Sequence, residues 1–459
     1  MATEITQDAT NAHHLVVLIH GLWGNPKHLQ HLHDSLATAY KDDGLYILLP
    51  ASNKDNFTYD GIEVGAERIT SEIEAKLAEL DAAGARITKI SIAGYSLGGL
   101  LARYVIGLLY QADVFATVQP VNFTTFATPH LGVRAPRTGY RAQTWNFLGA
   151  NTLSTSGRQM FLVDDFRGTG RPLLAVLADP DSIFVRGLAL FKHRSLYANT
   201  MNDRSVPYYT ACVSRVDPFA DADAIDINPL PNQGAPVVLD PETPCFPRGR
   251  GKAHTDVVAW HERYIMTART RESLPLFAAF VTLLPIAIPV FMVNAGIQTY
   301  RSAARVRLHE AGDLVDLTRY RMPLLEGTQQ QQAAQDRVKE TLLASSDHPA
   351  NSEGGYLPTP PPERSTSPAP TSVTSKGASA KEQELGPPSP SSSAWPTLAL
   401  TDDQFTMIDN LDAHVRFTKY PVHITKVHHT HAAIVRRIAK ESFSEGLEVS
   451  GHWVRNFEV

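Results

Sequence analysis

The chain contains the stretch Gly94-Tyr95-Ser96-Leu97-Gly98-Gly99, and this stretch decides which fold the sequence predicts. Residues 87–93 alternate and are rich in β-branched side chains, so they predict a strand. Residues 100–106 are apolar at helical spacing and predict a helix. A serine flanked in this way, between a strand and a helix, is typical of a nucleophile elbow, a tight turn that exposes the hydroxyl. We therefore predict that Ser96 is a nucleophile.

The glycines of this turn have a mechanical role in the prediction. Side chains at Gly94 and Gly98 would crowd its strained backbone. The turn also aims the N–H of Leu97 at a carbonyl under attack. We predict that the N–H of Leu22, in the His-Gly-Leu-Trp-Gly segment 20–24, completes an oxyanion hole. The alternative for residues 20–24 is a plain strand-to-helix turn.

The order of strands and helices predicts the fold class. Strands are predicted at residues 15–19, 45–50, 87–93 and 120–127. Helical patterns such as residues 61–77 separate them, which predicts a doubly wound, mostly parallel sheet. Together with the elbow, this order favours an α/β-hydrolase fold. Ligands of such sheets bind at the carboxyl ends of the strands, where His20, Ser96 and His130 fall.

A nucleophilic serine needs a base and an acid, and the chain order of this fold predicts both. Asp203 follows a late strand and precedes Val-Pro, the position from which an acid orients an imidazole. Asp217 is the alternative acid, and a helix-capping aspartate is the alternative role for either residue. The base is expected last in the chain. We predict His431 for it, with His429 as the alternative.

The histidines near His431 also allow other interpretations. A His-x-His group could bind zinc, but no cysteine or second ligand cluster accompanies it in the sequence, so no metal or cofactor is predicted. A surface helix cap with incidental histidines is a further alternative.

Composition excludes some functions. The chain is 43% hydrophobic, enough for a sizeable core, and its net charge of −5 argues against nucleic acid as a partner. Cys212 and Cys245 are too few for a disulfide framework, which favours a reduced, intracellular setting. Residues 1–11 are polar and lack a signal-peptide pattern, so the N-terminal part is expected in the cytosol.

The apolar segment 274–296 differs in kind from the rest of the chain. It contains no charged residue and is long enough to cross a bilayer, but Pro285 and Pro289 would break a helix in its middle. Arginines flank it on both sides. We expect a hairpin that dips into a membrane or monolayer, with a full span or a buried core helix as alternatives.

The predicted organisation has six parts. Residues 1–12 form a flexible N-terminus, and residues 136–180 of the hydrolase core are either a lid over the acyl site or ordinary packing helices. Residues 328–394 are rich in Ser and Pro and are expected to be disordered. In order, the six parts are 1–12, the hydrolase core 13–272, the apolar segment 273–300, an amphipathic connector 301–327, the disordered insert 328–394 and the C-terminal part of the core, 395–459.

A set of short motifs resembles the serine esterase family of lipase-like hydrolases, best known from fungi, and within it a lipid-droplet phospholipase of yeast. These motifs are His20-Gly21-Leu22-Trp23-Gly24, Tyr59-Asp60-Gly61-Ile62, Gly94 to Gly99, Ala127-Thr128-Pro129-His130-Leu131-Gly132, Asn202-Asp203-Arg204-Ser205-Val206-Pro207, and His431 to Arg436. The Ser/Pro-rich insert before the His431 motif departs from the family pattern.

The resemblance implies an ester hydrolase with Ser96 as nucleophile, Asp203 as acid and His431 as base. It implies glycerophospholipid or acylglycerol substrates at a lipid droplet or intracellular membrane surface, with the catalytic domain facing the cytosol. Two alternatives remain: a catalytically idle lipid-surface scaffold, against which the presence of all three residues argues, and a protein or acyl thioesterase with the same catalytic residues.

Overall fold

The structure is a computed structural model, and it describes residues 10–135, 146–147, 149–150, 152–248, 289–290, 292–312, 320 and 395–459. All of these residues belong to one compact unit of the chain. The predicted disordered insert, residues 328–394, lies outside the described residues. So does most of the apolar segment, residues 274–288.

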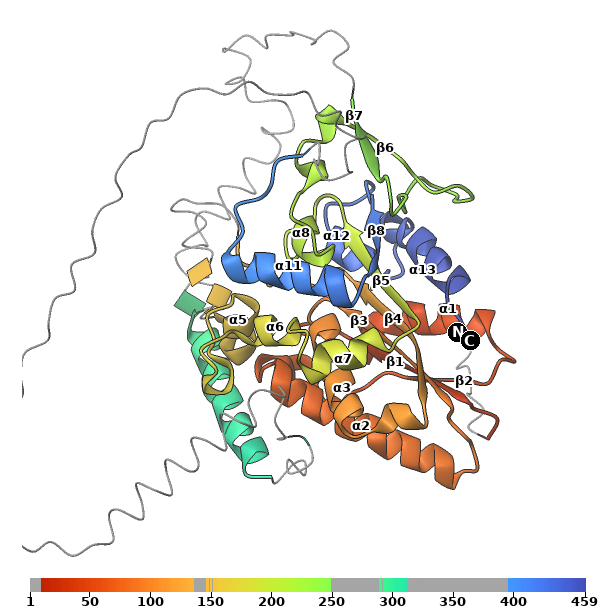
Figure 1. Cartoon of the computed structure of the whole chain (residues 1–459), viewed down its shortest axis with the longest axis vertical. Coiled ribbons are helices and arrows are strands. Elements are labelled where there is room, and N and C mark those ends of the chain that lie inside the picture. Colours follow the sequence, from red (N-terminus) through yellow and green to blue (C-terminus); the bar gives the residue numbers. More distant parts are fainter. Residues whose placement is uncertain are drawn as a thin grey trace, which may run out of the picture. The chain divides into compact units, whose positions relative to one another are not determined.

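A six-stranded, fully parallel sheet is the centre of this unit (Figure 1). In the order in which they pair, the strands are β2 (Leu45–Leu48), β1 (His14–Ile19), β3 (Lys89–Tyr95), β4 (Gln119–Phe126), β5 (His193–Asn199) and β8 (Thr418–Val422). The predicted doubly wound sheet is thus confirmed. Strand β8 comes from beyond the insert and pairs with β5 along Ser195–Asn199, so the C-terminal part completes the sheet.

Both faces of the sheet are covered, which explains why β1 is an uninterrupted apolar run. Side chains alternate between faces. Leu15 and Val17 therefore enter one core, and Val16 and Leu18 enter the other. The first core is covered by α2 (Ile62–Ala82), α3 (Leu97–Gln111), α6 (Leu173–Leu177), α7 (Ile183–Ala189) and α11 (Asp402–His414), and the second by α1 (Gln30–Ala39), α12 (Thr430–Ala433) and α13 (Gly446–Arg455).

Shorter elements complete the unit. Two antiparallel strands, β6 (Ile225–Ile227) and β7 (Cys245–Pro247), form a separate small sheet. Further helices are α5 (Ser154–Met160), α8 (Tyr208–Ala211) and the 3-10 helices η1 (Pro26–Leu29), η2 (Asp55–Tyr59), η3 (Val114–Ala116), η4 (Phe166–Gly168), η5 (Pro218–Ala220), η6 (Ala222–Ala224) and η8 (Glu441–Phe443).

The predicted lid range falls partly within the described residues. Residues 136–145 lie outside them, but α5 and α6 are described. Met160 and Leu173 to Leu177 are buried in the first core, as packing helices would be.

One helix crosses the boundary that the sequence predicted at residue 300. Residues 289–290 and 292–310 are helical, so the end of the apolar segment and the start of the connector form one element. Within the described part of the chain, no helix is both long enough and apolar enough to span a membrane.

Candidate active site

Ser96 stands on a strained turn between β3 and α3. Its backbone has φ 57° and ψ −128°, which few residues other than glycine adopt. A Cβ at Gly94 would lie 2.4 Å from the Cα of Gly99, and one at Gly98 would lie 2.1 Å from the carbonyl oxygen of Ile19. The predicted steric reason for these two glycines is therefore confirmed.

Gly99 is a third required glycine, which sequence reasoning left unexplained. A Cβ there would lie 2.1 Å from Oγ1 of Thr128. That hydroxyl donates a 2.9 Å hydrogen bond to the carbonyl of Ser96, so the loop after β4 supports the elbow directly.

The structure brings Ser96, His431 and Asp203 into one hydrogen-bonded relay. Nε2 of His431 lies 3.0 Å from Oγ of Ser96, and its Nδ1 lies 2.8 Å from Oδ2 of Asp203. The Asp203 side chain is only 1% exposed. These distances suit proton transfer from the hydroxyl to an imidazole that a carboxylate orients.

Local contacts hold Asp203 in place after β5. The backbone N–H groups of Ser205 and Val206 donate to its Oδ1, at 3.0 and 2.9 Å. The side-chain amide of Asn199 donates to Oδ2 at 2.8 Å. These contacts orient the carboxylate independently of its contact with the distant imidazole.

Tyr95 is a site residue that sequence reasoning missed. Its hydroxyl donates to the backbone carbonyl of His431 at 2.9 Å, and the two rings lie 5.1 Å apart. Burial raises the pKa of Tyr95, so the phenol stays a proton donor. The available signal was the aromatic residue directly before the serine.

The segment that carries His431 is also tied to the loop of the acid. Oγ1 of Thr430 donates to the carbonyl of Met201 at 2.9 Å. Because β8 joins β5, helix α12 starts beside the Asp203 loop although more than two hundred residues separate them.

The two predicted oxyanion donors lie on segments that touch. A Cβ on Gly21 would lie 2.7 Å from Cβ of Ser96, so the residue 20–24 turn abuts the elbow. Leu22 lines the same cavity as Ser96. Leu97 is the first residue of α3, where a backbone N–H has no acceptor within the helix.

The alternative acid and base occupy other positions. Asp217 caps η5 and accepts a 3.0 Å hydrogen bond from the N–H of Phe219, and burial raises the pKa of its carboxyl. His429 is exposed on the cavity wall, whereas His431 is the hydrogen-bond partner of Ser96. The described residues hold no cluster of three His, Cys, Asp or Glu side chains that could bind a metal ion.

His130 lies away from the relay, although it too follows a strand. It is fully buried, its Nε2 lies 2.9 Å from Oγ1 of Thr125, and Arg103 donates to its Nδ1 at 3.4 Å. Burial and then the Arg103 charge hold the pKa of His130 well below its usual value. This neutral, buried imidazole therefore has a structural role in the loop after β4, which supports the elbow.

The relay opens into a cavity of about 610 Å³. Its walls combine apolar side chains such as Leu22, Trp23 and Phe443 with cations. The cationic lining residues are Arg204, Arg437 and Lys440, and among the described lining residues there is no Asp or Glu.

Residues 9–215 match the family model described as "Putative serine esterase (DUF676)". This part of the chain is similar to that family. It contains the elbow and Asp203, whereas His431 lies outside the matched range. The resemblance to a serine esterase family that the short motifs predict is confirmed for this part of the chain.

The curated relatives are fungal proteins named as lipases. The "Putative lipase ROG1" of Saccharomyces cerevisiae is 30% identical over 237 residues, which cover 50% of this chain and 33% of that protein. The "Putative lipase C4A8.10" of Schizosaccharomyces pombe is 27% identical and covers 46% of this chain and 28% of that protein. This chain thus matches about a third of the length of these relatives.

Among solved structures, carboxyl esterase 2 of the fungus Tuber melanosporum aligns with 41% of this chain and 57% of its own. The sequence identity is 14% and the TM-score is 0.27.

Proposed function

We propose that this chain is a serine hydrolase that cleaves fatty-acyl esters of glycerophospholipids. The observation that carries the proposal is the relay from Asp203 through His431 to Ser96, on a strained elbow at the mouth of a cavity. The match of residues 9–215 to a serine esterase family model supports the same reaction class.

The proposed reaction has two halves. Oγ of Ser96 attacks the ester carbonyl while Nε2 of His431 takes its proton, and Asp203 stabilises the imidazolium. The N–H groups of Leu22 and Leu97 bind the oxyanion. His431 then protonates the departing glycerol oxygen, and water, activated by the same imidazole, releases the fatty acid from Ser96.

The cations of the cavity favour a phospholipid over a neutral acylglycerol. A phosphodiester carries a negative charge near the scissile ester, and Arg204, Arg437 and Lys440 could pair with it. The apolar walls beside Ser96 suit an acyl chain. Acylglycerols remain the second substrate class, because their ester is the same chemical group.

We also propose where the reaction takes place. The uncharged segment 274–296 favours attachment at the cytosolic surface of a lipid droplet or an intracellular membrane, where the substrate is concentrated. Substrate would then reach the cavity without crossing water.

A fluorophosphonate probe and a lipid panel test the proposal. Wild-type protein is expected to be labelled at Ser96 and to hydrolyse phospholipid emulsions, and Ser96→Ala is expected to do neither. A folded protein that takes no label would favour the idle scaffold. Labelling with turnover of acyl thioesters but not of lipid esters would favour the thioesterase.

The head-group contact has its own test. Arg204→Met combined with Lys440→Met should lower phospholipid hydrolysis about tenfold and leave triacylglycerol hydrolysis near wild type, since only the phosphate loses a partner. An equal loss on both substrates would contradict the assignment of these cations to the phosphate.

A further inference from the structure

The helix of residues 292–310 packs against the protein with its polar side. Its buried positions are Ala295, Gln298, Ser302 and His309, with Arg305 only partly exposed. These residues recur at intervals of three or four, so they form one helical stripe. A surface helix of a globular protein normally buries its apolar stripe instead.

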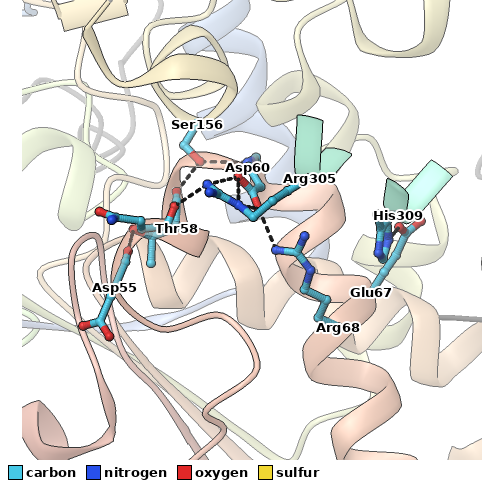
Figure 2. A network of polar contacts seen from close by, with 10 residues as sticks. Asp55, Thr58, Asp60, Glu67, Arg68, Ser156, Arg305 and His309 are labelled. Carbon is cyan, nitrogen blue, oxygen red and sulfur yellow. Dashed lines mark hydrogen bonds and ion pairs between the residues drawn. The ribbon is translucent and has the colours of Figure 1, made fainter. Parts of the chain in front are cut away.

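Ionic contacts hold this polar stripe to the start of α2 (Figure 2). The guanidinium of Arg305 reaches both oxygens of Asp60, with Nη2 to Oδ1 at 2.7 Å and Nε to Oδ2 at 2.9 Å. Arg68, on α2, donates to the same carboxylate at 2.8 Å. Asp60 is completely buried, so this carboxylate needs both partners.

A second contact lies one helical turn further on. Nε2 of His309 donates to Oε2 of Glu67 at 2.6 Å, and both side chains are completely buried. Tyr320 adds a third contact and donates to Glu74 at 2.7 Å. Glu67 and Glu74 are seven residues apart, a spacing that places them on one side of α2, and Asp60 lies two residues before this helix begins.

The opposite side of the helix is apolar and exposed. Val293 is 63% exposed and Ile297 is 46% exposed. Tyr300 and Leu308 follow on the same side, also exposed, and Arg301 and Arg307 lie at its edges. A continuous exposed apolar stripe marks an interaction site. The uncharged sequence 274–290 leads directly into this stripe.

Hydrogen bonds connect the segment that contacts the helix to the wall of the cavity. Asp60 directly follows η2, where the Thr58 hydroxyl accepts a 3.1 Å hydrogen bond from the N–H of Trp23. Trp23 lines the cavity beside Ser96 and is itself 52% exposed. The carbonyl of Thr58 also accepts a hydrogen bond from Ser156 of α5 (Figure 2).

We propose that the apolar face of residues 292–310 is a lipid-docking surface. The contacts with Asp60 and Glu67 hold the helix on the catalytic unit with this face toward solvent. Its occupant is a phospholipid layer with anionic head groups, since the apolar stripe suits the acyl boundary and the flanking arginines suit the phosphates. The inference rests on the proposed function for its substrate, but it concerns binding rather than catalysis. Because the polar stripe is clamped to α2, docking of the helix brings the cavity to the layer.

The test is co-sedimentation of the full chain with phosphatidylcholine vesicles, with and without phosphatidylserine. Val293→Asp with Ile297→Asp should lower the vesicle-bound fraction about tenfold, because charge enters the docking face. Hydrolysis of dissolved p-nitrophenyl butyrate should stay near wild type. The matched control is Leu190→Asp with Leu447→Asp, two apolar side chains of similar exposure, one directly after α7 and one on α13, and this variant should bind as wild type does.

The outcomes separate the two proposals. The docking surface is overturned if wild-type protein does not bind vesicles, or if the helix variant binds them as well as wild type. Either result holds regardless of the rate of ester hydrolysis. A helix variant that changes only the oligomeric mass in solution would overturn it in favour of contact with a second copy. If vesicles are bound but Ser96→Ala hydrolyses as well as wild type, the proposed hydrolase fails while the docking surface stands.

Arg305→Gln tests the clamp separately. It leaves the apolar face intact, so vesicle binding should persist, but the helix should be held less firmly on the catalytic unit, since only the His309–Glu67 and Tyr320–Glu74 contacts remain. Hydrolysis of vesicle phospholipid per bound molecule should fall several-fold while hydrolysis of the dissolved ester is retained. Unchanged vesicle hydrolysis would contradict the clamp.

Discussion

In the described part of the chain, the Asp203–His431 and Glu67–His309 pairs each join a buried carboxylate to an imidazole. They differ in the contact that the second ring nitrogen makes. In the Asp203–His431 pair, Nε2 faces the hydroxyl of Ser96 at 3.0 Å. In the Glu67–His309 pair, Nδ1 of His309 has no hydrogen-bond partner in the described part of the chain. The first ring is 19% exposed at a cavity, and the second is completely enclosed between two helices.

The comparison teaches that the pair itself carries no function. A carboxylate orients an imidazole equally well in both places. Chemistry requires a nucleophile on the other nitrogen and access for a substrate, and only the first pair has both. The second pair, with its short hydrogen bond and no access, serves to join one helix to another.

The largest difference is expected when each imidazole is removed. His431→Ala should lower ester hydrolysis by about 10⁴-fold, because the base is lost. His309→Gln should change hydrolysis of a dissolved ester less than about threefold, because a structural contact does not enter the transition state. Initial rates with p-nitrophenyl butyrate measure both, and comparable losses would break the distinction between the pairs.

The next largest effect concerns the acid. Asp203→Asn should lower the rate about 10³-fold, because an amide no longer stabilises the imidazolium. Asp217→Asn should cost less than about threefold, since Asp217 only caps η5. Steady-state kinetics of the two matched variants decide between them, and a greater loss at Asp217 would reverse the assignment.

A stability effect of smaller size is expected at the enclosed pair. Glu67→Gln alone should lower the free energy of unfolding by about 3 kcal/mol, because it weakens a buried hydrogen bond that no water can replace. Adding His309→Gln should cost less than a second such loss, since the two side chains form one contact. Urea unfolding of both single variants and the double variant measures this. Additive losses would show that the pair is not a unit.

The smallest effect is expected at the alternative base. His429→Gln should change the rate less than about threefold, because this exposed ring only lines the cavity wall. The His431→Ala variant in the same assay is the reference. If the two losses were similar, His429 would have to share the role of base.

Much of the candidate site could be predicted from local sequence because its signals are local. Gly94 and Gly98 are required by close approaches within a single turn, and the aspartate after β5 is held by N–H groups two and three residues further on. Such short-range geometry leaves a pattern that reading along the chain can find.

Contacts between distant segments could not be predicted in this way. Tyr95 looked like a variable position of the motif, and its partner is the carbonyl of His431, more than three hundred residues away. Residue 300 looked like a boundary because the apolar run ends there, yet the helix passes through it. Its Arg305 and His309 pair with Asp60, just before α2, and with Glu67, on α2, and these partners lie more than two hundred residues earlier in the chain.

The sequence by itself therefore determined the elbow, the alternation of strands and helices, and a short set of acids and bases. Each depends on steric limits or periodicity within a few residues. Only the tertiary structure decided which histidine meets Ser96 and which acid meets that histidine. It also decided that the Glu67–His309 pair connects two helices and has no catalytic role. The burial of a pair and the access of substrate to it depend on which distant segments pack together.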